Sequence, residues 1–296
     1  MQSIRNCIFA IALALGITPG QAADLQKLRI VATTTDLKSL AEAVGGKHVD
    51  VESIAAPNQD PHSIELKPTQ IARLRKASLV IRIGLDHEPW LARAQSKVRM
   101  VDASRGVRLL QTATPRLRAE RHSHVHAFGN PHYWLDPENS RAITAAIVEE
   151  FSRLQPQSRT EFEANRNHFL EQLDSRMQAW KQALAPYRGT KAVVMHDSWS
   201  YFADRFGLSI LAAAEPTPGV PPSPTELAKL FSRMREAKVR AIIADPHSSP
   251  SLVRYVSEHG GAPAVVLVPS VGAEPGVNDY LSLFDVNIQR LLMVLQ

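Results

Sequence analysis

Apolar runs of four to eight residues alternate with amphipathic stretches along most of this chain. In the first part the runs predict buried strands, with helical patterns between them. In the last third the same alternation returns. The predicted strands are 28–35, 49–56, 79–84, 99–104, 191–197, 208–213, 240–246 and 262–269, and the predicted helices are 36–45, 68–77, 199–207, 223–237, 249–260 and 277–295. This alternation predicts parallel sheets that are covered by helices on both faces.

The middle of the chain, from about residue 137 to residue 187, has an almost continuously helical pattern. Within it, apolar residues recur every three or four positions, which predicts one helix of more than twenty residues. We interpret this stripe as packing surface rather than as a cofactor site. Its members are Phe162, Phe169, Leu170, Leu173, Met177 and Trp180.

These patterns predict an α/β protein of two lobes. Each lobe has a four-stranded, mainly parallel sheet flanked by helices, and one long helix joins the two lobes, which have a cleft between them. We expect an N-terminal lobe over 23–155, a linking helix over 156–187 and a C-terminal lobe over 188–296.

The first 22 residues have the order of a secretory signal peptide: one positive charge, an apolar run and then small residues. We expect cleavage after Ala22 and a periplasmic, soluble protein. Cys7, the chain's single cysteine, precedes the apolar run, so it is not placed as a lipid-carrying cysteine. Without it the exported chain has no thiolate, and any transition metal must be bound by histidines and carboxylates.

The charge of the chain is +5, from 34 basic and 29 acidic residues. The basic residues are scattered among acidic ones rather than gathered in runs, and export also argues against nucleic acid as a partner.

Three of the eleven histidines lie where open α/β sheets place ligands, outside the carboxyl ends of the strands. His62 follows the second strand, His132 precedes the long helical region, and His196 ends the first strand of the second lobe. Two candidates come from one lobe and one from the other. This arrangement suits a metal ion bound in the cleft.

The chain resembles the periplasmic zinc- and manganese-binding proteins of bacterial ABC importers. The resemblance rests on four stretches in order: PHSIELKPTQIARLRKASLVIRIGLDHEPWL, NPHYWLDPEN, VVMHDSWSYFADRFGL and DYLSLFDVNI. It implies a two-lobe fold with a rigid linking helix and a metal bound by His62, His132 and His196. It also implies an ABC permease and its ATPase as partners, and we expect a monomer. A histidine at position 196 favours Zn²⁺ as the transported ligand over Mn²⁺, because three imidazoles suit zinc and manganese prefers oxygen.

The resemblance does not extend to a fourth ligand. Where many family members have an aspartate, this chain has Pro269 and Ser270, and neither is a good metal ligand. We predict Asp245, because it ends a strand. The alternatives are Asp60, Glu215, His247 and a water molecule.

His122, His124 and His126 alternate along one short segment, so an extended backbone would turn them to the same side. The family often has a longer histidine-rich loop here, which implies metal collection or transfer from a metallochaperone. The alternative is a solvated polar loop.

Three further residues lie near the candidate ligands. Asp136 and Asp197 could orient the ligand rings, and for Asp136 the alternative is a helix cap before Pro137. For His87 we favour capping or loop packing over ligation.

Capture of Zn²⁺ in the cleft and its delivery to an importer is the function that we expect, without enzymatic activity. The alternatives are a manganese-binding protein of the same class, an accessory zinc chaperone and a zinc-dependent hydrolase. Three histidines and a water also make a catalytic zinc site, but the chain has no HExxH motif.

Overall fold

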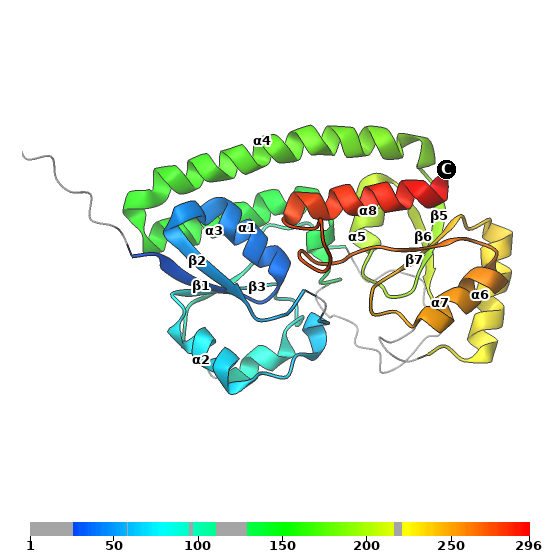
Figure 1. Cartoon of the computed structure of the whole chain (residues 1–296), viewed down its shortest axis with the longest axis horizontal. Coiled ribbons are helices and arrows are strands. Elements are labelled where there is room, and N and C mark those ends of the chain that lie inside the picture. The colour runs from blue at the N-terminus through cyan, green and yellow to red at the C-terminus, as the bar shows by residue number, and fades with distance from the viewer. Residues whose placement is uncertain (1–25, 58, 95–96, 111–128, 216–220) are drawn as a thin grey trace, which may run out of the picture.

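The computed structural model describes residues 26–57, 59–94, 97–110, 129–215 and 221–296. Two α/β lobes lie side by side, and a long helix runs along both of them (Figure 1). The two-lobe α/β prediction is confirmed, and each lobe has one sheet of four parallel strands. None of the helices in the described ranges combines the length and apolar character that a membrane span needs.

The first lobe has its strands in the order β2-β1-β3-β4, all parallel. Helices α1 and α3 cover one face of this sheet and α2 covers the other (Figure 1). The predicted first strand ends three residues early, because Thr34 accepts a hydrogen bond from Leu37 N and starts α1 there. The elements are β1 (Leu28–Ala32), α1 (Thr35–Gly45), β2 (Val49–Ser53), α2 (Pro68–Lys76), β3 (Leu79–Arg82), β4 (Met100–Asp102) and α3 (Ser140–Leu154).

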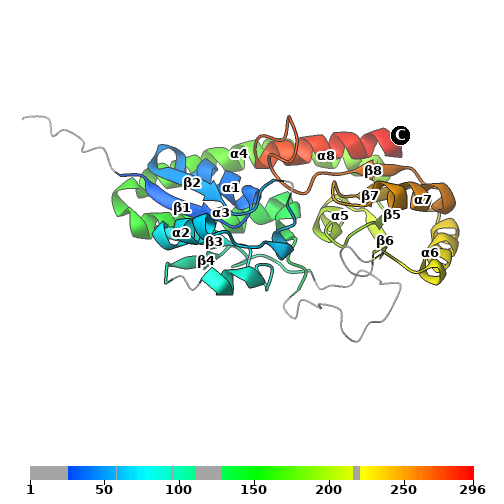
Figure 2. The ribbon, with the colours of Figure 1, turned by 60° about the horizontal axis from the view of Figure 1, so that its bottom comes forward.

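The second lobe repeats this plan with the order β6-β5-β7-β8, again all parallel. Helices α6 and α7 pack on one face, and α5 and α8 pack on the other (Figure 2). The elements are β5 (Lys191–Val194), α5 (Ser200–Phe206), β6 (Ser209–Ala213), α6 (Pro224–Ala237), β7 (Ala241–Ala244), α7 (Pro250–Gly260), β8 (Ala264–Val266) and α8 (Tyr280–Leu295).

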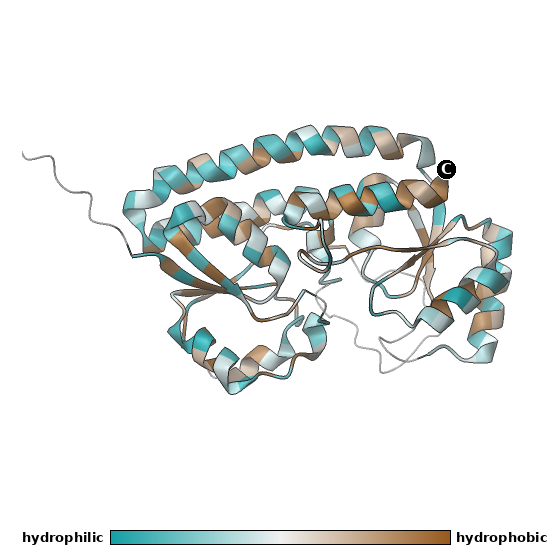
Figure 3. Cartoon of the chain, in the orientation of Figure 1, coloured by the Kyte–Doolittle hydropathy of each residue, from teal (hydrophilic) through white to brown (hydrophobic). Residues whose placement is uncertain are grey.

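The linking helix is α4 (Arg159–Leu184), whose 26 residues give it a length of about 39 Å. It packs on α1 and α3 in the first lobe and on α8 in the second. Teal, hydrophilic positions alternate along α4 with brown, hydrophobic ones (Figure 3), and the apolar residues of the helix are largely buried. Of the predicted stripe, Phe162, Phe169, Leu173, Met177 and Trp180 are buried, and Leu170 is half-buried.

The helical region before α4 is not continuous. Gln155 has an extended φ of −140°, and α3 ends at the residue before it. The cause is Pro156, whose ring disfavours a helical conformation at the preceding residue. Short 3₁₀ turns occupy Gly46–His48, Pro61–Ser63, Pro89–Ala94, Tyr133–Leu135, Pro137–Asn139, Pro156–Ser158 and Ala185–Tyr187.

The lobes also meet through the loop between β8 and α8, which the sequence pattern did not predict. Trp134 Nε1 donates to the Pro269 carbonyl at 3.0 Å. Val271 N donates to Asp36 Oδ1 at 3.0 Å, from one lobe to the other. The long helix is therefore not the only structure that holds the lobes together.

Candidate metal site

The three histidines predicted as ligands meet between the lobes. Each of His62, His132 and His196 offers a ligand atom within 4.8 Å of the others. His62 Nε2 and His132 Nε2 are 3.4 Å apart. Two nitrogens that bind one tetrahedral zinc at 2.0–2.1 Å are separated by about 3.3–3.4 Å, so this spacing already suits that ion.

Local contacts of the first lobe hold His62 in place. Its backbone N–H donates to Asp60 Oδ1 at 2.9 Å, so the carboxylate of Asp60 caps the 3₁₀ turn that carries the histidine. Trp90 Nε1 donates to the carbonyl of Pro61 at 2.8 Å. Through this hydrogen bond Asp60 positions the turn that carries His62.

His132 is 7% exposed and lies just before the 3₁₀ turn Tyr133–Leu135. Its Nδ1 lies 2.9 Å from Asn130 Oδ1, and its ring packs against Trp134 at a centroid distance of 5.2 Å. His196 follows β5 in the second lobe, and its ring meets that of His132 edge to face at 5.4 Å. The site thus depends on both lobes.

The histidines line a cavity of about 870 Å³. All four residues considered for the fourth ligand line it as well: Asp60, Glu215, Asp245 and His247. In the described part of the chain, the cluster of side chains that could bind one metal ion consists of the three histidines and does not include Asp245. The carboxylate of Asp245 accepts hydrogen bonds from Trp199 Nε1 at 2.9 Å and from Ser198 Oγ. Burial raises the pKa of Asp245 to about 7. Its role as a ligand stays a prediction.

His87 is a buried neighbour of the site whose contact with the ligands the sequence pattern did not reveal. It is fully buried, and its ring packs edge to face on that of His62 at a centroid distance of 4.0 Å. Beside it, Glu88 accepts hydrogen bonds from Thr33 Oγ1 and from the backbone N–H groups of Ile83 and Gly84. His87 follows β3, so the rule of strand ends could have indicated it.

The turn that carries His87 is itself unusual. Leu85 and Asp86 both have positive φ values, of 55° and 58°, which ordinary residues adopt at a cost of about 1–3 kcal/mol. The buried carboxylate of Glu88 binds the start of this turn at Ile83 and Gly84, and burial raises the pKa of Glu88 to about 7.

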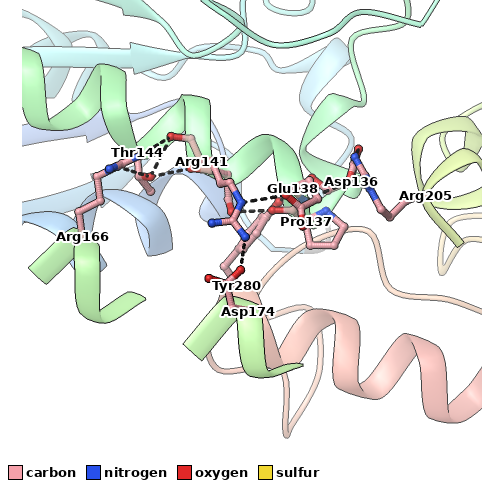
Figure 4. Close-up of polar contacts among 10 residues, drawn as sticks. Asp136, Pro137, Glu138, Arg141, Thr144, Arg166, Asp174, Arg205 and Tyr280 are labelled. Atoms are coloured by element: carbon pink, nitrogen blue, oxygen red, sulfur yellow. Dashed lines mark hydrogen bonds and ion pairs between the residues drawn. The ribbon is translucent and has the colours of Figure 1, made fainter. Parts of the chain in front are cut away.

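Asp136 caps a 3₁₀ turn, as one of its two interpretations predicted. Its Oδ1 accepts from Glu138 N at 3.0 Å, and its carboxylate binds Arg205 of α5 through two hydrogen bonds of 2.6 and 2.7 Å. Figure 4 shows this pair at one end of a chain of polar contacts that continues through Glu138 and Arg141 to Asp174. The pair therefore ties the segment after His132 to the second lobe.

The carboxylate of Asp197 accepts a hydrogen bond from Ser200 Oγ at 2.7 Å, at the start of α5. Its carbonyl accepts from Asn130 Nδ2 at 3.0 Å. The predicted metal-collecting residues His122, His124 and His126 lie outside the described residues.

Asp36, which accepts a hydrogen bond from Val271 of the other lobe, leads us to predict how the stability of the protein depends on pH. Asp36 is fully buried, and burial raises its pKa to about 7. Between about pH 4 and pH 7 the folded state then binds one proton more than the unfolded state, so stability falls as pH rises through this range. Replacing Asp36 with Asn removes this ionisation.

We expect Asp36→Asn to match the wild type near pH 4 and to exceed its free energy of unfolding at pH 8 by on the order of 2–4 kcal/mol. Urea denaturation of the metal-free protein at both pH values measures the difference. A wild type that is the more stable protein at pH 8 would contradict this interpretation.

The fold and the candidate site together are those of a two-lobe binding protein, with three histidines placed between its lobes where they could bind a metal ion. A family model for the periplasmic component A of the zinc-uptake complex matches residues 30–293. The chain belongs to this family.

Proteins similar to this chain include curated zinc uptake proteins and a solved structure of one of them. The chain is 27% identical, over an alignment of 313 positions, to the high-affinity zinc uptake system protein ZnuA of Paracoccus denitrificans, covering 95% of both chains. It is 26% identical over 277 residues to ZnuA of Yersinia pestis, covering 86% of each. A crystal structure of ZnuA superimposes with a TM-score of 0.79 at 27% identity, covering 92% of this chain and 100% of the other.

Proposed function

We propose that this protein captures Zn²⁺ in the periplasm and delivers it to an ABC importer. The observation that carries the proposal is the meeting of three imidazoles from two lobes, with two of their nitrogens at the spacing of a tetrahedral zinc site. Family membership supports it, because the matching model describes a periplasmic zinc-uptake component.

The ligand set favours zinc over manganese. As the proposed ligands, His62, His132 and His196 would supply three nitrogens, and zinc accepts nitrogen ligands in a tetrahedral site. Manganese is better served by carboxylate, carbonyl and water oxygens. A fourth, oxygen ligand would complete the tetrahedron, and we propose Asp245 for it, because it lines the same cavity as the histidines.

The fourth ligand can be tested separately. If Asp245 binds the metal, Asp245→Asn should lower the zinc affinity by about 10- to 100-fold or more, since even the removal of a residue that only orients a ligand has this effect. Glu215→Gln is the matched control, because it lines the same cavity. If only Glu215→Gln weakens binding, Glu215 is the fourth ligand. If neither does, the fourth ligand is Asp60, His247 or a water molecule, and Asp60→Asn and His247→Ala separate these.

The partners that we propose follow from membership of the zinc-uptake family. We propose that an integral permease receives the metal, that its ATPase is the second partner, and that the chain docks as a monomer. Contacts between the lobes restrict wide opening, so release would come from local movement of the segment that carries His196. We propose a role in collecting metal from a metallochaperone for His122, His124 and His126.

For the rest of the chain we propose the following division: a signal peptide over 1–22, lobes over 23–155 and 188–296, and the helix over 156–187 between them. The exported protein is then soluble rather than lipid-anchored. We also propose that it has no hydrolytic activity; turnover of ester or peptide substrates by the zinc-loaded protein would contradict this.

Uptake by cells tests the function. Cells that lack this protein should take up ⁶⁵Zn more slowly than the wild type at submicromolar zinc, and the intact gene should restore uptake, whereas a gene for the His132→Ala variant should not. Normal uptake in cells without the protein, provided that no second zinc importer operates, would contradict the proposal.

A further inference from the structure

Asn130 lies at the junction of the two lobes, two residues before the ligand His132, and is 2% exposed. Its side-chain oxygen Oδ1 lies 2.9 Å from both the backbone nitrogen and the ring Nδ1 of His132. Its side-chain nitrogen Nδ2 lies 3.0 Å from the carbonyl oxygen of Asp197. The amide thus contacts the ligand of one lobe and the residue next to the ligand of the other.

Two of these partners fix the hydrogen-bond roles. The backbone N–H of His132 can only donate and the carbonyl of Asp197 can only accept, so the orientation of the Asn130 amide is determined. Its Oδ1 has no hydrogen, and therefore Nδ1 of His132 must carry the proton of the neutral ring. Nε2 is then the unprotonated nitrogen, and it is the atom that lies 3.4 Å from His62 Nε2.

The backbone of Asn130 strengthens the connection between the lobes. Its carbonyl accepts a hydrogen bond from Tyr201 Oη of α5 at 2.8 Å, and Tyr201 Oη in turn accepts from Leu110 N at 3.0 Å. Asp197 and Tyr201 both belong to the segment that follows β5 and carries His196. A displacement of this segment therefore acts on the same residue that orients the ring of His132.

We propose that Asn130 is a positioning residue with two effects: it fixes the metal-binding tautomer of His132, and it couples that ring to the second lobe. Movement of the segment around Asp197 then weakens the ligands of both lobes together, so that zinc leaves in one step rather than remaining bound to His62 and His132. This inference rests on the proposed zinc capture.

Two substitutions separate these effects. Asn130→Leu has a similar shape and removes both the acceptor and the donor. Asn130→Asp keeps acceptor oxygens for His132 but loses the N–H that binds Asp197. Asn165→Asp is the matched control, because Asn165 Nδ2 donates to the Val44 carbonyl at 3.0 Å between α4 and α1 and takes no part in the site.

Three quantities are measured on the purified proteins: zinc affinity by chelator competition, the rate of zinc dissociation, and the ¹⁵N shifts of the His132 ring without metal. In the metal-free wild type we expect the Nδ1–H tautomer at His132. Asn130→Leu should lose this preference and bind zinc about 10- to 100-fold more weakly. Asn130→Asp should keep the tautomer yet release zinc several-fold faster, and Asn165→Asp should behave as the wild type.

The outcomes distinguish a failure of this inference from a failure of the proposed zinc capture. A wild type that does not bind zinc overturns the proposed function. A wild type that binds zinc but has the Nε2–H tautomer at His132 overturns the inference, even if neither variant of Asn130 folds. Wild-type affinity and dissociation in both Asn130 variants would also overturn it.

Discussion

His132→Ala is expected to lower the zinc affinity of this protein by about 100- to 1,000-fold. Binding free energies of structural zinc sites are about 10–16 kcal/mol for four ligands, so one ligand accounts for roughly 2.5–4 kcal/mol. His132 is the middle of the three histidines, since its ring contacts those of both His62 and His196. Chelator competition with the metal-free variant measures the loss.

The equivalent change in the other lobe, His196→Ala, should have an effect of the same size, because the proposed site takes ligands from both lobes. His168→Ala is the control: it removes an exposed histidine of α4 and should leave zinc binding as it is. Should His196→Ala retain the affinity of the wild type, the metal would be bound by the first lobe alone, and a site between the lobes would be the wrong description.

Asp136→Ala is expected to lower the free energy of unfolding by about 2–4 kcal/mol. The carboxylate is 6% exposed and makes two hydrogen bonds to Arg205, whose side chain is 30% exposed. Its loss leaves a half-buried guanidinium without its partner and removes a helix cap. Urea denaturation at pH 7 without metal measures the change.

Asp174→Ala provides the matched control in the same network (Figure 4). Asp174 pairs with Arg141, but its side chain is 63% exposed, and pairs of this kind contribute about 0–1 kcal/mol. Equal losses in the two variants would show that burial of the Asp136–Arg205 pair between the lobes adds nothing to stability.

The arrangement of strands and helices could largely be predicted from the sequence, because apolar runs of strand length alternate with amphipathic helices and buried parallel strands leave this pattern. The predicted ends of strands and helices were less accurate where a single side chain determines the end. Thr34 begins α1 inside the predicted first strand, and Pro156 divides the helical region into α3 and α4. Strand order follows from contacts between distant segments, which local patterns do not contain.

For the site, strand-end position and the family resemblance were enough to choose His62, His132 and His196, which the structure brings together. The residues around them were harder to find. Asn130 acts through the geometry of its amide, and the loop at Val271 reaches Asp36 across 235 positions of the chain. Neither contact has a periodicity or spacing that a single sequence would reveal. His87 was visible after β3, but only its packing on His62 shows that it belongs to the site.

A chelator-competition titration of the metal-free protein with Zn²⁺ and with Mn²⁺ tests the central claim most directly. The three imidazoles that meet between the lobes predict one tightly bound zinc per chain and much weaker binding of manganese. Zinc that binds weakly or without a stoichiometry of one, or manganese that binds as tightly as zinc, would contradict the assignment of this protein as a zinc-capturing component.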